Sequence, residues 1–170
     1  MSYTIFVSHS FNDSQIIGEM ETAFEESDVK LYMANRDFNY GHELPAKIKK
    51  AIDSSDAVLA ILTSNASESN SVNQEVGYAI GKEKLVVPMV ERGAKIGVLL
   101  EGLELVFFSL EKIRDVFSDV SRYFSKLAAK KKKTSASKKV RDALIFIGLA
   151  VAAVAVVGVL AYEATRKSHD

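Results

Sequence analysis

The chain has 170 residues with 22 basic and 22 acidic side chains, so its formal net charge is zero. This total hides an asymmetry: residues 1–129 carry 13 basic and 19 acidic side chains (net −6), whereas residues 130–170 carry 9 and 3 (net +6). The acidic larger part argues against a nucleic-acid-binding domain. The absence of cysteine excludes disulfides, a cysteine-based zinc site and a thiol nucleophile.

The N-terminal part predicts a strand, a helix and a second strand. Tyr3–Ser8 (YTIFVS) is short and rich in the residues that favour strands. Apolar residues then recur at helical spacing as far as Phe24, and Asn12 or Asp13 is a suitable N-cap for that helix. Val29–Met33 has the composition of a second strand.

The middle of the chain predicts a long loop, a helix and a buried strand. Asn35–Leu44 (NRDFNYGHEL) is a polar loop of ten residues, longer than most loops between strands and helices. Pro45 suits the first turn of a helix that we expect to end at Ser54. Asp56–Thr63 (DAVLAILT) is almost continuously apolar, which is typical of a central strand buried on both faces.

The rest of the domain continues this alternation. We expect a polar segment at Ser64–Asn73, a helix at Val76–Lys82 and a strand at Lys84–Val90. A short helix at Lys95–Leu100, a strand at Leu105–Ser109 and an amphipathic helix at Ile113–Phe124 are expected to follow. Five strands alternating with helices predict an α/β fold with a parallel sheet and right-handed crossovers. Ligands bind such sheets beyond the carboxyl ends of the strands, so we expect the site among the polar loops His9–Asp13, Asn35–Leu44 and Ser64–Glu75.

The common nucleotide-binding and nucleophile motifs are missing from the sequence. No G-x-G-x-x-G follows the first strand, and neither G-x-x-x-x-G-K-[ST] nor G-x-S-x-G occurs anywhere. Glu75, however, opens a helix that packs on the sheet near the expected site. A carboxylate there is suited to act as a general base or to bind ribose hydroxyls. The alternative is a glutamate that only caps the helix or interacts with its dipole.

The long loop offers side chains that suit a nucleotide. The rings of Phe38 and Tyr40 are suited to stack on a flat heterocycle, and Arg36 is suited to pair with a phosphate. The alternative is a surface loop with one aromatic residue turned inward. His9, directly after the first strand, is a further candidate for substrate contact, with a loop or capping role as its alternative. The three histidines are scattered along the chain, so we expect no metal site.

The C-terminal tail predicts a membrane anchor. Ala143–Tyr162 holds twenty uncharged residues, enough for a helix of about 30 Å to cross a bilayer. A buried core helix is the alternative. The expected organisation is a domain at 1–128, a basic linker at 129–142, the span at 143–162 and an external tail at 163–170. Because most basic residues precede the span, the domain is expected in the cytoplasm.

The basic linker has its own expected partner. Next to a membrane span, the lysines of Lys130–Lys139 are expected to attract anionic lipid headgroups. A nuclear-localisation or nucleic-acid-binding patch is the alternative, since runs of lysine serve both purposes. The acidic domain leads us to expect no nucleic-acid partner.

Four stretches in this order resemble a prokaryotic TIR (Toll/interleukin-1 receptor) domain. They are IFVSHS at Ile5–Ser10, RDFNYGHELPAKIKKAIDSS at Arg36–Ser55, DAVLAILTSN at Asp56–Asn65 and SNSVNQEVGYA at Ser69–Ala79. Each stretch alone is weakly specific, and their order and spacing carry the resemblance, which covers roughly residues 1–128. It implies a flavodoxin-like fold with strand order 2-1-3-4-5.

The resemblance also implies an activity and a set of site residues. Many TIR domains cleave NAD at the nicotinamide–ribose bond, and the required glutamate corresponds to Glu75. The loop Asn35–Leu44 matches the mobile BB loop of the family, and Phe6, Ser8 and Phe11 lie near positions that line the nucleotide cleft. NAD is then a substrate, no cofactor is needed, and contacts between TIR domains imply a homo-oligomer.

One departure from the family pattern lies before the glutamate. Relatives often have Ser-x-Trp; here Ser69 matches the serine, but Ser71 stands at the tryptophan position. A bulky apolar wall is therefore lost.

Three functions follow from these observations. The first is a membrane-anchored NADase or producer of a cyclic ADP-ribose-type signal in antiviral defence. The second is a non-enzymatic adaptor that assembles through TIR–TIR contacts. The third is an enzyme like the nucleoside deoxyribosyltransferases, which also use a glutamate on a flavodoxin-like sheet.

Overall fold

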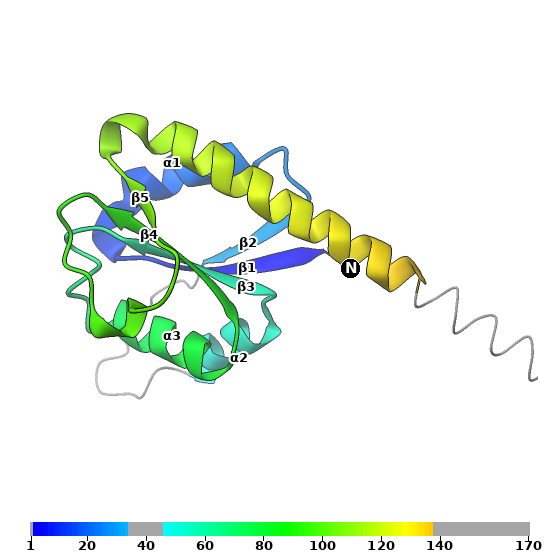
Figure 1. Cartoon of the computed structure of the whole chain (residues 1–170), viewed down its shortest axis with the longest axis horizontal. Helices are drawn as coiled ribbons and strands as arrows, with labels where there is room; N and C mark the ends of the chain where they lie inside the picture. Colours follow the sequence, from blue (N-terminus) through cyan, green and yellow to red (C-terminus); the bar gives the residue numbers. More distant parts are fainter. Residues whose placement is uncertain (1, 34–45, 138–170) are drawn as a thin grey trace, which may run out of the picture. The chain divides into compact units, whose positions relative to one another are not determined.

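Five strands form one parallel sheet in the computed structural model, which describes residues 2–33 and 46–137 (Figure 1). The strands are β1 (Tyr3–Ser8), β2 (Val29–Met33), β3 (Ala57–Leu62), β4 (Leu85–Glu91) and β5 (Val106–Phe108). Their order is β2-β1-β3-β4-β5, and every pair of neighbours is parallel. The α/β class and the strand order predicted from the sequence are confirmed, and each strand overlaps its predicted range.

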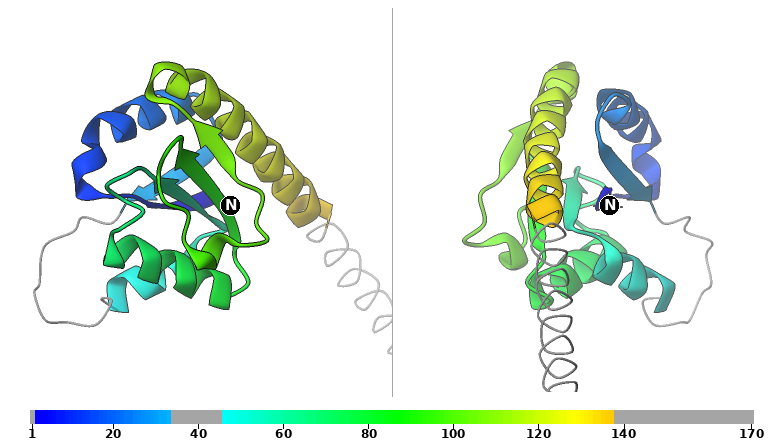
Figure 2. Two further views of the ribbon diagram at one scale, coloured as in Figure 1. Left: turned by 60° about the vertical axis from the view of Figure 1, so that its left-hand side comes forward. Right: turned by 90° about the vertical axis from the view of Figure 1, so that its right-hand side faces the viewer.

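Helices cover both faces of the sheet (Figure 2). The α-helices are α1 (Ser14–Phe24), α2 (Ala46–Ser54) and α3 (Asn70–Gly81), and a further helix begins at residue 113. Three short 3-10 helices are η1 (Phe11–Asp13), η2 (Val98–Leu100) and η3 (Leu110–Lys112). The helices α2 and α3 lie on one face of the sheet, whereas α1 and residues 113–128 lie on the other.

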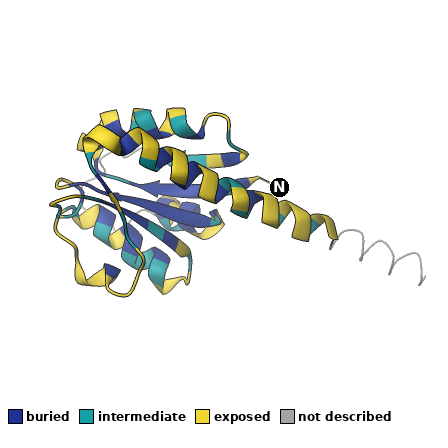
Figure 3. Cartoon of the chain, turned by 45° about the horizontal axis from the view of Figure 1, so that its top comes forward, coloured by how far each residue is buried: buried dark blue, intermediate teal, exposed yellow. Residues whose placement is uncertain are grey.

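The sheet divides the core into two apolar clusters because side chains alternate along a strand. In β1, Ile5 and Val7 belong to the cluster under α1, whereas Phe6 belongs to the cluster under α2 and α3. Every residue of β3 is buried, as predicted for a central strand covered on both faces. The outer faces of the helices are exposed (Figure 3).

The second of the two units into which the chain divides begins at residue 129. Only residues 129–137 of this unit are described, and they are helical. The part of the predicted basic linker that the structure describes is therefore regular helix.

The predicted membrane topology is not supported. Within residues 2–33 and 46–137, no helix combines the length and the apolar character that a bilayer span requires. The long helix that begins at residue 113 carries charged side chains along its length, which explains this result. The single-pass localisation with an external C-terminus is corrected accordingly, and membrane association through Lys130–Lys139 is likewise unsupported. The ranges 143–162 and 163–170 lie outside the described residues.

The packing of the last helix on the sheet gives a stability prediction. Phe117 is fully buried in the cluster under α1, so Phe117→Ala leaves a large cavity. We expect the free energy of unfolding to fall by about 3–5 kcal/mol. Phe107→Ala removes an aromatic ring of the same size from a half-exposed position on β5, and we expect a loss of about 1 kcal/mol or less. Denaturant unfolding of the full chain measures both, and equal losses would contradict this packing.

Candidate functional site

A buried carboxylate and a buried hydroxyl meet at the carboxyl end of β1. Ser8 is the last residue of β1, and Glu75 lies in the second turn of α3. The Ser8 hydroxyl donates a hydrogen bond of 2.5 Å to the Oε2 atom of Glu75. The side chain of Glu75 is 2% exposed and Ser8 is fully buried. The pair joins α3 to β1 beside the position where the strand order reverses, which is where ligands bind such sheets.

The sequence of α3 dictates this inward direction. Val72, Val76 and Ala79 are buried against the sheet and define the packed face of the helix. Glu75 follows Val72 by three residues and therefore lies on the same face. The alternative of a capping or dipole-directed glutamate does not describe what is seen, because the first turn of α3 holds no acidic residue and Glu75 bonds to Ser8.

An aromatic pair lies on the same side of the sheet. Phe6 precedes Ser8 by two residues, so both side chains leave β1 toward α3. The ring of Phe6 is buried and stacks on Tyr32 of β2, with centroids 6.1 Å apart and planes at 26°. Tyr32 is partly buried and was not among the residues predicted from the sequence. The signal that would have found it is its position directly opposite Phe6 once the strands are paired in register.

Three other predicted site residues lie within the described part of the chain. His9 is half-buried, and its Nδ1 lies 3.0 Å from the carbonyl oxygen of Ser10. Phe11 lies in η1 with 68% of its surface exposed, so the structure does not bring it into the buried pair. Ser69 is the N-cap residue of α3, and its side chain makes no capping hydrogen bond. Three further candidates lie outside the described residues: Arg36, Phe38 and Tyr40.

Comparison with known families agrees with this fold. The family model described as "TIR domain" matches residues 5–119, which is most of the described sheet and its helices. This chain belongs to the TIR-domain family. The five-stranded parallel sheet in the order 2-1-3-4-5 is the arrangement of TIR domains. A search of curated protein sequences found no match.

Solved structures share the fold of this TIR domain at low sequence identity. The TIR domain of the Toll-related receptor TRR-2 from Hydra magnipapillata superposes with a TM-score of 0.58 at 17% identity, covering 74% of this chain and 99% of that one. The CMP N-glycosidase BcmB of Clostridium botulinum gives 0.53 at 16% identity, covering 71% and 99%. A prokaryotic SEFIR domain gives 0.52 at 15% identity, covering 71% and 97%.

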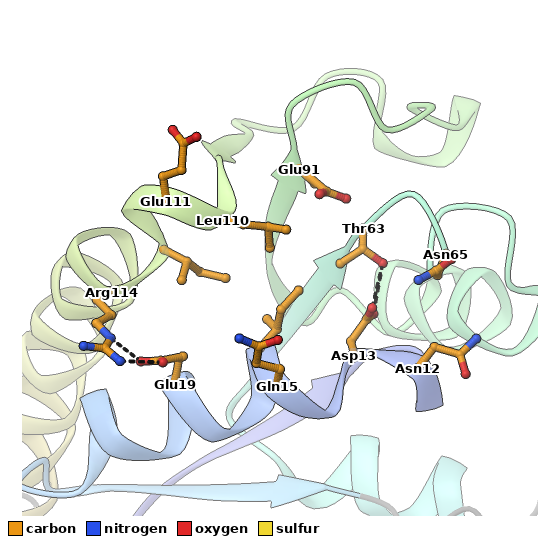
Figure 4. A pocket seen from close by; sticks show the side chains of 12 residues that line it. Asn12, Asp13, Gln15, Glu19, Thr63, Asn65, Glu91, Leu110, Glu111 and Arg114 are labelled. Carbon is orange, nitrogen blue, oxygen red and sulfur yellow. Dashed lines mark hydrogen bonds and ion pairs between the residues drawn. The ribbon is translucent and has the colours of Figure 1, made fainter.

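A hollow lies on the α1 side of the TIR domain's sheet (Figure 4). It has a volume of about 520 Å³ and lies beyond the carboxyl ends of β3 and β4. At one end Arg114 donates two hydrogen bonds to Glu19, of 2.5 and 2.8 Å. At the other end Thr63 bonds to the carboxylate of Asp13. Within the described residues, no group of three acidic or histidine side chains is arranged to hold a metal ion.

The contact between Glu19 and Arg114 gives a prediction about pH. Hydrogen bonds from Arg114, followed by its charge, hold the pKa of Glu19 below its ordinary value of 4.5. Because this pKa is lowered on folding, the stabilisation is complete above the pKa of the unfolded chain and is lost as pH falls through the folded value. We expect Arg114→Gln to raise the pKa of Glu19 toward 4.5, measured by NMR titration of its carboxyl carbon.

A second arginine of the same helix is the control for this titration. Arg122 lies eight residues after Arg114 and pairs with Asp119 at 3.1 Å, so Arg122→Gln should leave the titration of Glu19 unchanged. The difference in unfolding free energy between the native protein and the Arg114→Gln variant should shrink in acid and at high salt. An unaltered Glu19 titration in Arg114→Gln would show that the ion pair does not form in solution.

Proposed function

We propose that this TIR domain cleaves NAD at the bond between nicotinamide and ribose, with Glu75 as the catalytic carboxylate. The observation that carries the proposal is the hydrogen bond from Ser8 to the buried Glu75 at the carboxyl end of the sheet. A carboxylate is costly to bury, so one retained among apolar side chains marks a candidate functional site. Its position also matches the glutamate on which TIR enzymes depend.

The chemistry fits a single carboxylate. When the N-glycosidic bond breaks, its electron pair leaves with nicotinamide, and positive charge develops on the ribose. The nicotinamide ring is cationic in NAD and leaves as a neutral molecule, so no second acid is needed to protonate it. Glu75 would bind the ribose hydroxyls and stabilise the developing charge, and Ser8 would orient the carboxylate. Water, or an internal nucleophile of the substrate, then completes the reaction.

The aromatic pair on the Glu75 side of the sheet suits the flat parts of such a substrate. The stacked pair of Phe6 and Tyr32 supplies a rigid apolar wall on the same side of the sheet. The roles of three loop residues remain predictions. The guanidinium of Arg36 would bind a phosphate of NAD, and the ring of Phe38 or Tyr40 would close over the base.

Relatives of the fold support this reaction class without deciding it. BcmB is described as a CMP N-glycosidase, so a sheet of this architecture carries the cleavage of an N-glycosidic bond in that protein. TIR domains also commonly assemble through TIR–TIR contacts, and we propose that this chain forms a homo-oligomer when active. A role in antiviral defence would follow from NAD depletion or from a signal made from NAD.

A non-enzymatic adaptor is the second candidate, and one observation favours it. Glu75 is 2% exposed, so in this structure its carboxylate does not face a substrate. Catalysis requires the site to open, whereas an adaptor that assembles through TIR–TIR contacts does not. The two functions therefore differ in whether Glu75 matters for anything beyond folding.

The test is turnover of NAD by the full chain and by Glu75→Gln. We expect Glu75→Gln to lower the rate of nicotinamide release by about a hundredfold or more, because the amide cannot balance developing positive charge. The reactions are run at high protein concentration and with fusions that enforce oligomers. Mass spectrometry of the products then distinguishes ADP-ribose from cyclised products. A deoxynucleoside offered in parallel tests the deoxyribosyltransferase alternative.

The matched control for this test is Glu111→Gln. Glu111 is an exposed glutamate of η3 on the other side of the sheet, so its loss should leave turnover within about twofold. Unchanged turnover by Glu75→Gln, with contaminating activity excluded, would overturn the assignment of Glu75. Inactivity of the native oligomer with NAD would favour the adaptor.

A further inference from the structure

A second polar pair joins the loops after β1 and β3 on the α1 side of the sheet. The hydroxyl of Thr63 donates to the carboxylate of Asp13, with its oxygen 3.0 and 3.1 Å from the two carboxylate oxygens (Figure 4). Asp13 is 3% exposed and Thr63 is 2% exposed. The loop after β1 and the loop after β3 are thus tied together from side chains fifty positions apart in the sequence.

The Thr63 hydroxyl also fixes the loop that leads to α3. Its oxygen accepts a hydrogen bond of 3.0 Å from the backbone N–H of Ala66. The carbonyl oxygen of Ala66 accepts from the N–H of Ser69 at 3.0 Å, and the carbonyl oxygen of Ser69 accepts from the N–H of Asn73 at 3.0 Å. A continuous series of hydrogen bonds therefore runs from Asp13 to the first turn of α3.

Asp13 occupies a position where a different role is expected. It is the N-cap residue of α1, where an aspartate side chain ordinarily accepts a hydrogen bond from the first turn of the helix. Here the carboxylate makes no capping hydrogen bond and turns to Thr63 instead. The stabilisation available from capping is given up for the contact between the two loops.

We infer that Asp13 and Thr63 are positioning residues for Glu75. This inference rests on the proposed NAD cleavage. An α-helix moves as a rigid element, so a displacement where α3 begins is carried along the helix to Glu75 in its second turn. The contact between Asp13 and Thr63 holds the loop between β3 and α3 from the α1 side of the sheet. On the α3 side, this keeps the Glu75 carboxylate within hydrogen-bond reach of Ser8. Misplacement of a catalytic group by about 1 Å lowers turnover by up to about a hundredfold.

The test compares two substitutions of Thr63 in the full chain. Thr63→Val keeps the shape and removes the hydroxyl, whereas Thr63→Ser keeps the hydroxyl. We expect Thr63→Val to lower kcat about tenfold to a hundredfold with the KM for NAD within about threefold, and Thr63→Ser to restore most of kcat. Assays are run well below the melting temperature of every variant, so that loss of folded protein does not contribute.

Thr22→Val is the matched control. Thr22 is an exposed threonine of α1 whose hydroxyl donates to the carbonyl oxygen of Gly18 at 3.0 Å, so the same change is made away from the loops. Its kcat should equal that of the native chain. A kcat for Thr63→Val within twofold of native, or a Thr63→Ser variant as slow as Thr63→Val, would overturn the inference.

Amide hydrogen exchange provides a readout that does not need activity. We expect the N–H of Asn73 to exchange about tenfold faster in Thr63→Val than in Thr63→Ser, because the loop that precedes α3 opens more often. If the native chain fails to cleave NAD, the proposed function is wrong and exchange alone judges the positioning role. Equal exchange of Asn73 in both variants would then overturn the role by itself.

Discussion

The burial of Glu75 is the constraint on which the site depends. An ionisable side chain is costly to remove from water unless a partner replaces the lost hydrogen bonds, and the Ser8 hydroxyl supplies one. That contact exists because β1 and β3 are neighbours in the sheet and because α3 must bury Val72 and Val76 on the face toward which Ser8 points. The packing of one helix therefore determines where the carboxylate lies.

Two polar contacts join the strand ends from opposite sides of the sheet. Ser8 and Glu75 lie on the α3 side, where Phe6 and Tyr32 add an aromatic wall. The other contact, between Asp13 and Thr63, lies on the α1 side and borders the hollow of Figure 4. In the function proposed here, the first contact holds the reacting carboxylate and the second supports the loop that leads to α3.

The sequence predicted the sheet well because strand alternation and buried apolar runs are local signals. The place of Glu75 on a helix packed against the sheet was also predictable, and the family resemblance singled it out as the candidate glutamate. The partner of Asp13 was not, because the capping preference of aspartate is local whereas its contact with Thr63 depends on the fold. Tyr32 was missed for the same reason. The membrane topology was inferred from an uncharged stretch and the basic residues before it, and the described helices do not support it.

The most direct test of the central claim separates binding from chemistry at Glu75. Glu75→Gln keeps a side chain that can hydrogen-bond to ribose hydroxyls but removes the negative charge that stabilises the transition state. Calorimetric titration of this full-length variant with NAD, followed by an NMR spectrum of the recovered nucleotide, measures both. The account predicts saturable binding with NAD intact. Release of nicotinamide by the variant at the native rate, or loss of binding, would contradict it.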